Sequence, residues 1–202
     1  MVSKFEAELL GMHVGDGTLY RVNSTLVWEL RGDLKEYGYY HLHVLPLLKK
    51  IFKRDFILKY RSGGKNGCIG VQTCDKRLTS FLLENEMPIG KKSHIIWIPE
   101  VILQSSVSSK YFLRGLFDTD GCLRFDKVDY PRIEIGSSSL KLINDVSLLL
   151  TTFDLRFHQW VDRRTQTYRI CVNGVKMIKK WMKLVGSSNT KHLNKYLLIF
   201  KN

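Results

Sequence analysis

The sequence lacks long apolar runs and any pattern that directs a chain into a membrane or out of the cell. None of its apolar stretches approaches the ~20 residues that a bilayer-spanning helix needs. The N-terminus has no charged segment followed by an apolar one, which is the pattern of a secretion signal. The sequence also has no amphipathic basic helix and no lipidation motif. We therefore expect a cytoplasmic, intracellular protein with no membrane partner.

Cysteine is scarce and irregularly spaced. The four cysteines are Cys68, Cys74, Cys122 and Cys171. None of them forms the Cys-x-x-Cys pair that is typical of zinc and redox sites. Most lie in strand-like apolar patterns, where a thiol packs as a small apolar side chain. We expect all four to be reduced.

Acidic residues are few in comparison with basic ones. Nineteen Asp and Glu stand against 32 Lys and Arg, which gives a formal net charge of +13. The basic residues form no continuous tract and are spread through strand-like segments. Because 44% of the residues are hydrophobic, the charge lies on a folded surface and not on a disordered polycation. The expected partner is nucleic acid, and hence the expected location is the nucleoid; a solvated basic surface is the alternative.

One nine-residue pattern occurs twice. The segment Leu9–Gly17, LLGMHVGDG, returns about half the chain further on as Leu113–Gly121, LRGLFDTDG. Each copy has the pattern of an apolar helix with two small residues four positions apart, which fall on one helix face. The small residues are Gly11 and Gly15 in the first copy and Gly115 and Thr119 in the second. Small side chains let helix backbones approach closely, so we expect the two helices to touch.

Both copies end in Asp-Gly. Gly17 and Gly121 suit the position just past a helix, where glycine readily takes the left-handed conformation. Asp16 and Asp120 would then lie close together at two negative helix ends, and their repulsion would need a cation to offset it. Mg²⁺ binds few protein oxygens and keeps positions for water and phosphate, which suits phosphodiester chemistry. For a single copy, a helix that runs into a turn would be explanation enough.

The two copies resemble the paired motifs of the LAGLIDADG homing endonucleases, and a chain that carries both is similar to the monomeric, intron-encoded type. The resemblance implies an α+β fold of duplicated αββαββα units. In this fold two antiparallel four-stranded sheets form a DNA-binding saddle, and the motif helices meet at a pseudo-two-fold interface. The two halves are expected at residues 1–98 and 99–202.

Apolar periodicity predicts the same order of elements in both halves. In the first half we expect a helix over 4–14, strands over 18–22 and 25–30, a helix over 34–52 disturbed near Pro46, strands over 56–61 and 68–73 joined by a turn at 62–67, and a helix over 75–86. After a connector with a short helix at 100–105, we expect strands over 122–126 and 132–135, a helix over 138–153, strands over 156–164 and 167–172, and a last strong helix over 175–185.

The resemblance assigns site residues by their match to the motifs. Asp16 and Asp120 are the expected catalytic carboxylates and Mg²⁺ ligands, with the backbone carbonyls of Gly15 and Thr119 as auxiliary ligands. The other two members of the expected catalytic group are Lys92 and Lys191. Such a lysine follows the last helix of each half in the family and reaches the scissile phosphate, where a cation stabilises developing charge or polarises the attacking water.

The family often has a basic or amide residue at the end of the second strand, and Arg31 matches it in the first half. Its counterpart falls near Ile135-Gly136, so we expect the two half-sites to be unequal. We expect no metal-binding role for His13, because no second ligand lies at a suitable spacing and magnesium disfavours imidazole. We expect Asp118 to be an interface or capping residue.

Strands laid in the major groove would contact bases through alternate side chains, with Arg suited to guanine and Gln to adenine. The candidates are Arg21, Arg31, Lys59, Arg61, Gln72, Arg124, Arg132, Gln159, Arg163 and Arg169. For any one of them, a phosphate contact or a solvated charge is an equal alternative.

The predicted function is that of a monomeric, Mg²⁺-dependent endonuclease that cuts both strands of double-stranded DNA at a long asymmetric site. One alternative is an RNA maturase that binds intron RNA and assists splicing, and another is a DNA-binding protein that has lost cleavage. The presence of both motif carboxylates favours cleavage. A basic interaction protein of α+β class is a further alternative, which the duplicated Asp-Gly motifs disfavour.

Overall fold

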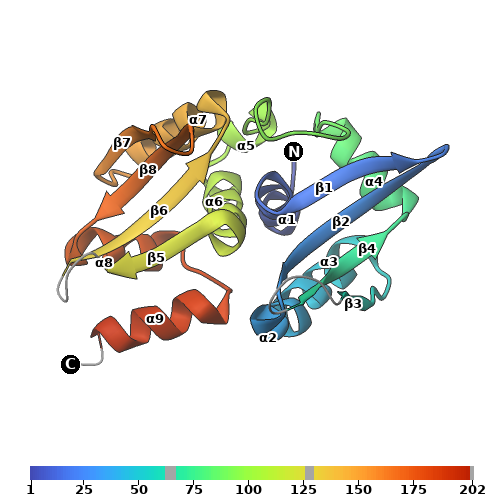
Figure 1. The fold of residues 1–202 in the computed structure, drawn as a ribbon, viewed down its shortest axis with the longest axis horizontal. Helices are drawn as coiled ribbons and strands as arrows, with labels where there is room; N and C mark the ends of the chain where they lie inside the picture. Colours follow the sequence, from blue (N-terminus) through green and yellow to red (C-terminus); the bar gives the residue numbers. More distant parts are fainter. Residues whose placement is uncertain (62–66, 126–129, 201–202) are drawn as a thin grey trace.

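The computed structural model describes residues 1–61, 67–125 and 130–200, and its two halves repeat one order of elements (Figure 1). The first half consists of α1 (Lys4–Val14), β1 (Gly17–Val22), β2 (Thr25–Asp33), the 3₁₀ turn η1 (Leu34–Glu36), α2 (Tyr37–Tyr39), the π turn η2 (Tyr40–Val44), α3 (Leu45–Phe52), β3 (Leu58–Arg61), β4 (Cys68–Thr73) and α4 (Lys76–Glu84). The short helix α5 (Glu100–Leu103) lies in the connector. The second half consists of α6 (Ser106–Asp120), β5 (Gly121–Phe125), β6 (Pro131–Ser137), α7 (Leu140–Thr152), β7 (Phe157–Asp162), β8 (Thr167–Asn173), α8 (Val175–Leu184) and α9 (Thr190–Phe200).

Each half is built around a four-stranded antiparallel sheet. The strand orders are β1-β2-β4-β3 and β5-β6-β8-β7, so each hairpin of the first sheet has an equivalent in the second. The sheets lie on either side of α1 and α6, which run side by side through the centre of the molecule (Figure 1). The predicted α+β fold of duplicated units, with the motif helices at the interface, is confirmed.

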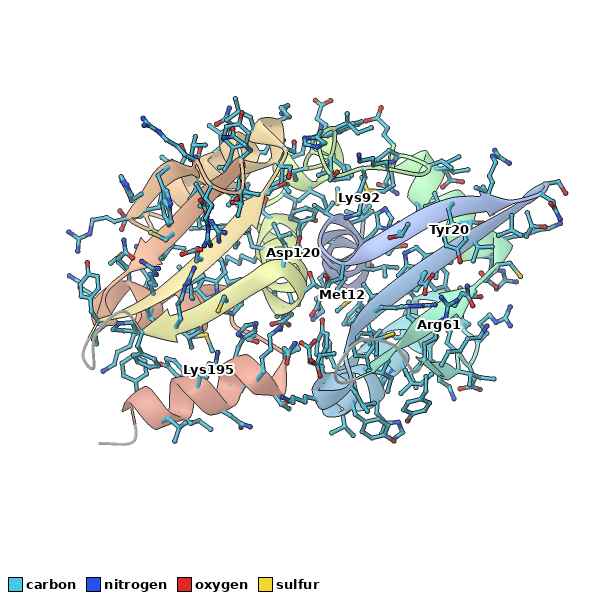
Figure 2. The ribbon with its side chains drawn as sticks, in the orientation of Figure 1. Met12, Tyr20, Arg61, Lys92, Asp120 and Lys195 are labelled. Carbon is cyan, nitrogen blue, oxygen red and sulfur yellow. The ribbon has the colours of Figure 1, made fainter. Side chains whose placement is uncertain are left out.

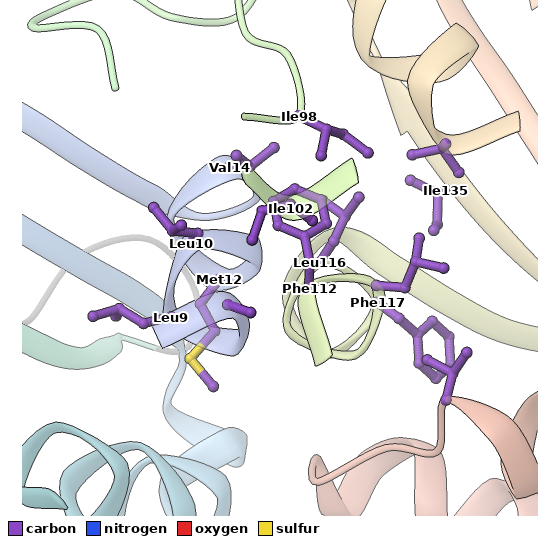
Figure 3. Packing of buried hydrophobic residues seen from close by; sticks show 14 of the residues in the cluster. Leu9, Leu10, Met12, Val14, Ile98, Ile102, Phe112, Leu116, Phe117 and Ile135 are labelled. Carbon is purple, nitrogen blue, oxygen red and sulfur yellow. The ribbon is translucent and has the colours of Figure 1, made fainter. Parts of the chain in front are cut away.

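The two motif helices begin with side-chain caps and bury apolar side chains between the halves. Ser3 and Glu6 form a capping box at the start of α1, and Ser105 caps α6. Figure 3 shows the apolar side chains of both helices packed together, with Ile98 and Ile102 from the connector against them. These side chains are almost completely buried, so the interface between the halves is part of the hydrophobic core.

The backbones of α1 and α6 touch at the small residues, as predicted. A Cβ atom on Gly11 would lie 2.1 Å from the carbonyl oxygen of Phe112, and one on Gly115 would lie 2.1 Å from the carbonyl oxygen of Glu8. A Cβ atom on Gly15 would lie 2.1 Å from Thr119 Oγ1. Glycine is therefore required at Gly11 and Gly115 because another backbone occupies the space of the side chain.

The left-handed conformation expected at Gly17 and Gly121 is wrong. Gly121 has φ −80° and ψ 159°, which is extended backbone, and Gly17 is not among the glycines with positive φ. Both residues start a strand directly after a motif helix. A Cβ atom on Gly17 would lie 2.5 Å from His13 Cα, and one on Gly121 would lie 2.3 Å from the Phe117 ring. The strand folds back so closely over the last helical turn that only glycine fits.

The helix predicted over 34–52 is irregular, and its distortion precedes Pro46. The backbone passes through 3₁₀, α and π turns before α3 starts at Leu45. In the π turn the Leu45 N–H donates to the Tyr40 carbonyl, five residues back. Proline lacks an N–H and collides with the carbonyl four residues earlier, so a wider turn before Pro46 relieves the conflict.

The prediction that the helix at 175–185 is the last strong one is wrong, because α9 follows it. Asn189 caps α9 by accepting a hydrogen bond from the Lys191 N–H, and the ring of His192 stacks on Phe117 with centroids 4.2 Å apart. Lys195 Nζ donates to the Leu123 carbonyl at 3.2 Å. These contacts attach α9 to its own half.

The turn predicted at 62–67 lies outside the described residues except for Gly67, and so does Asp126, the predicted end of a strand. All four cysteines are free. Within the described part of the chain, no helix has the length and apolarity needed to cross a membrane.

His13 packs as a neutral core side chain. It is completely buried, and the indole Nε1 of Trp28 donates to His13 Nδ1 at 3.1 Å. Burial, followed by the nearby charge of Lys92, lowers the pKa of His13 to about 3. The imidazole is therefore uncharged at neutral pH and holds the first strand pair against the motif helix.

Candidate active site

The two motif carboxylates meet where α1 and α6 end. The side chains of Asp16 and Asp120 are hydrogen-bonded to each other. Each is open to solvent on one side and closely surrounded by protein on the others. This partial desolvation, followed by the charge of Asp120, raises the pKa of Asp16 to about 7. Desolvation also raises the pKa of Asp120. The pair therefore retains a proton near neutral pH.

The same pair provides the hard oxygen donors that a divalent cation prefers. A bound cation would replace the shared proton and remove the repulsion between the carboxylates. Over residues 1–61, 67–125 and 130–200, no three His, Cys, Asp or Glu side chains form a cluster able to hold a metal ion. The remaining ligands would therefore be backbone carbonyls, water or phosphate oxygens. The hydroxyl of Thr119 is not one of them, because it donates to the Gly115 carbonyl at 2.9 Å.

Lys92 lies at the same helix end. Its Nζ donates to the backbone carbonyls of Val14 and Gly15, at 2.5 Å each, and so caps the negative end of α1. Burial lowers the pKa of Lys92, and the charges of Asp120 and Asp16 oppose this shift. The structure thus brings Lys92 to the carboxylate pair and to the predicted auxiliary ligand, the carbonyl of Gly15.

Lys191 approaches from the C-terminal half and has a different partner. Its Nζ donates to Oε1 of Glu36 at 2.8 Å, which links the start of α9 to η1 of the other half. The charge of Lys191 acts to lower the pKa values of Asp16 and Asp120, so it also belongs to the site electrostatically.

The two lysines lie at a similar distance from the last helix of their half but have different contacts. Lys92 comes eight residues after the end of α4, and Lys191 comes seven residues after the end of α8. Lys92 is held by two backbone carbonyls, whereas Lys191 is held by the carboxylate of Glu36. The site is therefore unequal in the partners of its lysines.

Sequence reasoning missed two residues beside the site, Glu36 and Asn189. Asn189 Nδ2 donates to Glu36 Oε1 at 2.7 Å and to the Asp118 carbonyl at 2.9 Å. Glu36 also acts to raise the pKa of Asp16. The sequence did hold a signal for Glu36, because Asp33 and Glu36 have capping-box spacing, and they form that box around η1. The contact with Asn189 joins the two halves and has no local signal.

A hollow of about 540 Å³ opens beside the carboxylates. Asp16, Lys92 and Asp120 line it together with the beginning of β1 and with Ser137 and Thr167 from the C-terminal sheet. Figure 2 shows Lys92 and Asp120 near the central helix pair, between the two sheets. A substrate in this hollow would reach both carboxylates and Lys92 at once.

The comparison with known proteins agrees with the duplicated fold and the motif helices. A family profile described as "LAGLIDADG-like domain" matches residues 109–186. I-DmoI, solved in complex with DNA and Mn, superposes with a TM-score of 0.64 and 19% identity over 91% of this chain and 96% of that chain. Residues 109–186 thus match a LAGLIDADG-like domain, and the chain as a whole shares the fold of I-DmoI.

Two other solved structures are about as similar to this chain. I-WcaI bound to its DNA recognition sequence has a TM-score of 0.64 and 14% identity over 92% of this chain and 82% of that chain. Full-length DUF199/WhiA from Thermatoga maritima has a TM-score of 0.65 and 19% identity over all of this chain and 61% of that chain. At these identities the likeness shows a shared fold. No curated protein matches the sequence.

Most DNA-binding candidates of the N-terminal sheet share its outer face, which is the face opposite to the buried apolar side chains. Arg31 and Lys59 both pair with Gly70, and Arg61 pairs with Cys68, so these side chains project to one side. Lys59 Nζ donates to Gln72 Oε1 at 3.1 Å on the same face. Figure 2 shows Arg61 over this sheet.

Arg21 differs from the other candidates. It pairs with Leu26 and shares the sheet face of the buried Leu19 and Trp28. Only its place at the end of β1 leaves the guanidinium exposed. Arg21 therefore points from the edge of the sheet and not across the outer face.

The C-terminal sheet brings three of its five candidates together. Arg124 and Arg132 are cross-strand partners on its outer face, and Arg169 lies opposite Gly136 on the same face. Gln159 instead pairs with the buried Ile170, and its Nε2 donates to the Ile143 carbonyl of α7 at 3.3 Å. Arg163 lies exposed in the turn between β7 and β8.

Proposed function

We propose that the chain is a site-specific, divalent-cation-dependent endonuclease that cuts both strands of a DNA duplex. The observation that carries this proposal is the hydrogen-bonded pair of motif carboxylates at the end of two helices, between two sheets with basic outer faces. The homing endonucleases I-DmoI, solved with DNA and Mn, Mg or Ca, and I-WcaI, solved on its DNA recognition sequence, support it.

In the proposed site, Asp16 and Asp120 hold the cation, for which we propose Mg²⁺. When bound, such an ion ligates a phosphate oxygen and lowers the pKa of its water. Asp16 gives up its proton to admit the ion, because only the ionised carboxylate is a good ligand. Lys92 and Lys191 keep positive charge beside the scissile phosphates, where it stabilises the charge that develops there.

The outer faces of the two sheets form a saddle over the major groove, and residues 1–98 and 99–202 each cover one half-site as parts of a monomer. We infer that the protein acts on DNA in the cytoplasm or nucleoid of its host. The net charge of +13 supports a polyanionic partner.

The decisive experiment is cleavage of a randomised duplex library with Mg²⁺, with Ca²⁺ as the non-catalytic control, followed by sequencing of the cut ends. Staggered double-strand cuts at one long asymmetric site, with Mg²⁺ only, are the expected result. Tight binding without cuts in either metal ion would contradict the proposal. It would favour a cleavage-deficient DNA-binding protein or an RNA maturase.

A cleavage-deficient DNA-binding protein is the second candidate, because both lysines of the site are engaged. Lys92 is held by two backbone carbonyls, and Lys191 is paired with Glu36. The metal comparison in the library experiment separates the two candidates, since only the endonuclease responds to the exchange of Ca²⁺ for Mg²⁺.

The saddle also predicts a steep dependence of binding on salt. If the two outer faces neutralise about six phosphates, the affinity for duplex DNA should fall about a thousandfold between 50 and 200 mM salt. Fluorescence anisotropy with a labelled duplex at a series of salt concentrations measures this slope. A flat response would contradict an extended groove along both sheets.

A further inference from the structure

The outer face of the C-terminal sheet has a buried carboxylate at its centre. Glu134 in β6 is only 2% exposed, although it lies on the face that is open to solvent. Its neighbours across the strands are Cys122 on one side and Cys171 on the other. An acidic residue in the middle of a basic surface opposes the attraction of DNA, so its presence calls for a physical reason.

Three arginines from three strands converge on this carboxylate. Arg169 NH1 lies 2.6 Å from Glu134 Oε1, and Arg132 NH2 lies 3.4 Å from Oε2. Arg124 NH2 also contacts Oε1. Arg169 is held from a second side by Asp162, at 3.3 Å. Glu134 therefore ties β5, β6 and β8 together through their side chains as well as through the backbone.

The guanidinium groups are held but not covered. The side chains of Arg124, Arg132 and Arg169 are 41%, 22% and 28% exposed, whereas Glu134 is at 2%. Each guanidinium carries about five N–H donors in a rigid fork, and a carboxylate offers about four acceptor positions. One carboxylate thus holds side chains from three strands, while part of each arginine side chain stays exposed to solvent.

The N-terminal sheet has the same arrangement in simpler form. The pairs Gly17↔Leu30 and Gly121↔Ile135 align the two sheets, and this alignment makes Glu29 the equivalent of Glu134. Glu29 forms an ion pair with Arg31.

The register also identifies the missing counterpart of Arg31. Arg31 pairs with Gly70 in the first half, whereas Gly136 pairs with Arg169 in the second. The arginine and the glycine have exchanged strands at the same place in the sheet. Both halves therefore hold an arginine against the equivalent glutamate, and the C-terminal half adds two more.

We propose that Glu134 is a positioning residue that determines specificity: it holds Arg124, Arg132 and Arg169 as a fixed array that recognises guanine edges in one half-site. This inference rests on the proposed binding of duplex DNA. A guanidinium fork matches O6 and N7 of guanine, and a side chain fixed before binding loses less conformational freedom on contact. The half-site under the C-terminal sheet is thus richer in guanine contacts than the other.

A role of Glu134 through its charge and a role through positioning predict opposite effects on DNA binding when the carboxylate is removed. Removing a carboxylate from a DNA-binding face should strengthen binding to every sequence if Glu134 acts only through its charge. If Glu134 positions the arginines, Glu134→Gln should weaken binding to the preferred site. Glu84→Gln is the matched control, because it makes the same change of charge at an exposed residue of α4 in the N-terminal half, away from the Glu134 cluster.

The measurement uses the full chain in Ca²⁺. The wild type selects a preferred duplex from a randomised library, and the dissociation constants of each variant for this duplex and for a scrambled one are then compared. We expect Glu134→Gln to lower the ratio of specific to non-specific affinity by about tenfold or more, the effect of losing a good bidentate contact. Glu84→Gln should leave the ratio unchanged. A Glu134→Gln protein that binds both duplexes like Glu84→Gln would overturn the inference.

Two further outcomes are decided by the same assay. If the wild type selects no preferred duplex, the proposed function fails first, and the inference fails with it. If Glu134→Gln does not fold, Arg124→Gln takes its place, because it leaves Glu134 with two arginines. Unchanged preference at every base pair with Arg124→Gln would contradict the guanine array, and loss of preference confined to one half-site would support it.

Discussion

Replacing Gly115 with alanine is expected to lower the free energy of unfolding by ~4 kcal/mol or more, or to prevent folding altogether. The new Cβ atom would lie 2.1 Å from the Glu8 carbonyl oxygen and 2.9 Å from the Met12 amide nitrogen. Both are backbone atoms of α1 and cannot rotate away. The methyl group fits only if α1 and α6 move apart, and this would loosen the apolar interface between the halves.

Urea unfolding followed by circular dichroism measures this effect, and Gly38→Ala is its control. Gly38 lies in α2, where the nearest atom to a new Cβ would be Thr190 Oγ1 at 3.9 Å. This substitution should be neutral or stabilise the protein by up to about 1 kcal/mol, because alanine favours the helix. Equal stabilities of the two variants would mean that the motif helices do not pack as closely as the structure has them.

The fold was largely predictable because its strongest signals are periodic and repeated. The duplicated motif and the spacing of its small residues predicted that α1 and α6 touch, and reciprocal contacts at Gly11 and Gly115 confirm it. The conformation of Gly17 was not predictable, since the choice between a left-handed turn and a direct step into a strand depends on how the strand lies over His13. The last helix, α9, was missed because its contacts with Phe117 and Leu123 are long-range.

The candidate site was predictable where the sequence repeats a residue at matched positions, and it was not predictable where the position of a side chain depends on strand register. Asp16 and Asp120 stand at the ends of two similar motifs, so their proximity followed once the helices touched. The counterpart of Arg31 could not be found by spacing, because Arg169 belongs to a neighbouring strand and only the register brings it to the equivalent place. Register likewise decides the face of Arg21, since a shift by one residue reverses the face of every side chain.

Replacing Asp16 with asparagine is expected to reduce DNA cleavage by about a thousandfold or more while DNA affinity and folding are retained. An amide cannot supply the charge that a divalent cation needs, but it can still donate a hydrogen bond to Asp120, as the protonated Asp16 does. Cleavage of the selected duplex in Mg²⁺ and binding in Ca²⁺ measure the two quantities. Asp118→Asn is the control. The Asp118 carboxylate accepts hydrogen bonds from Ser187 and Ser188, so this substitution should leave cleavage unchanged.

The same substitution has a predictable effect on the pH dependence of stability. The pKa of Asp16 is raised to about 7 in the folded protein, above its value in the unfolded chain. The folded state therefore binds more protons, and the contribution of Asp16 to stability falls as the pH rises through the range between the two pKa values. An asparagine side chain does not titrate, so the Asp16→Asn variant should gain stability relative to the wild type between about pH 5 and pH 8 in urea unfolding. If the Asp16→Asn variant is less stable than the wild type at both about pH 5 and about pH 8, Asp16 serves to end the helix. If the variant is inactive but more stable than the wild type at about pH 8, Asp16 is retained for chemistry at the expense of the stability of the fold.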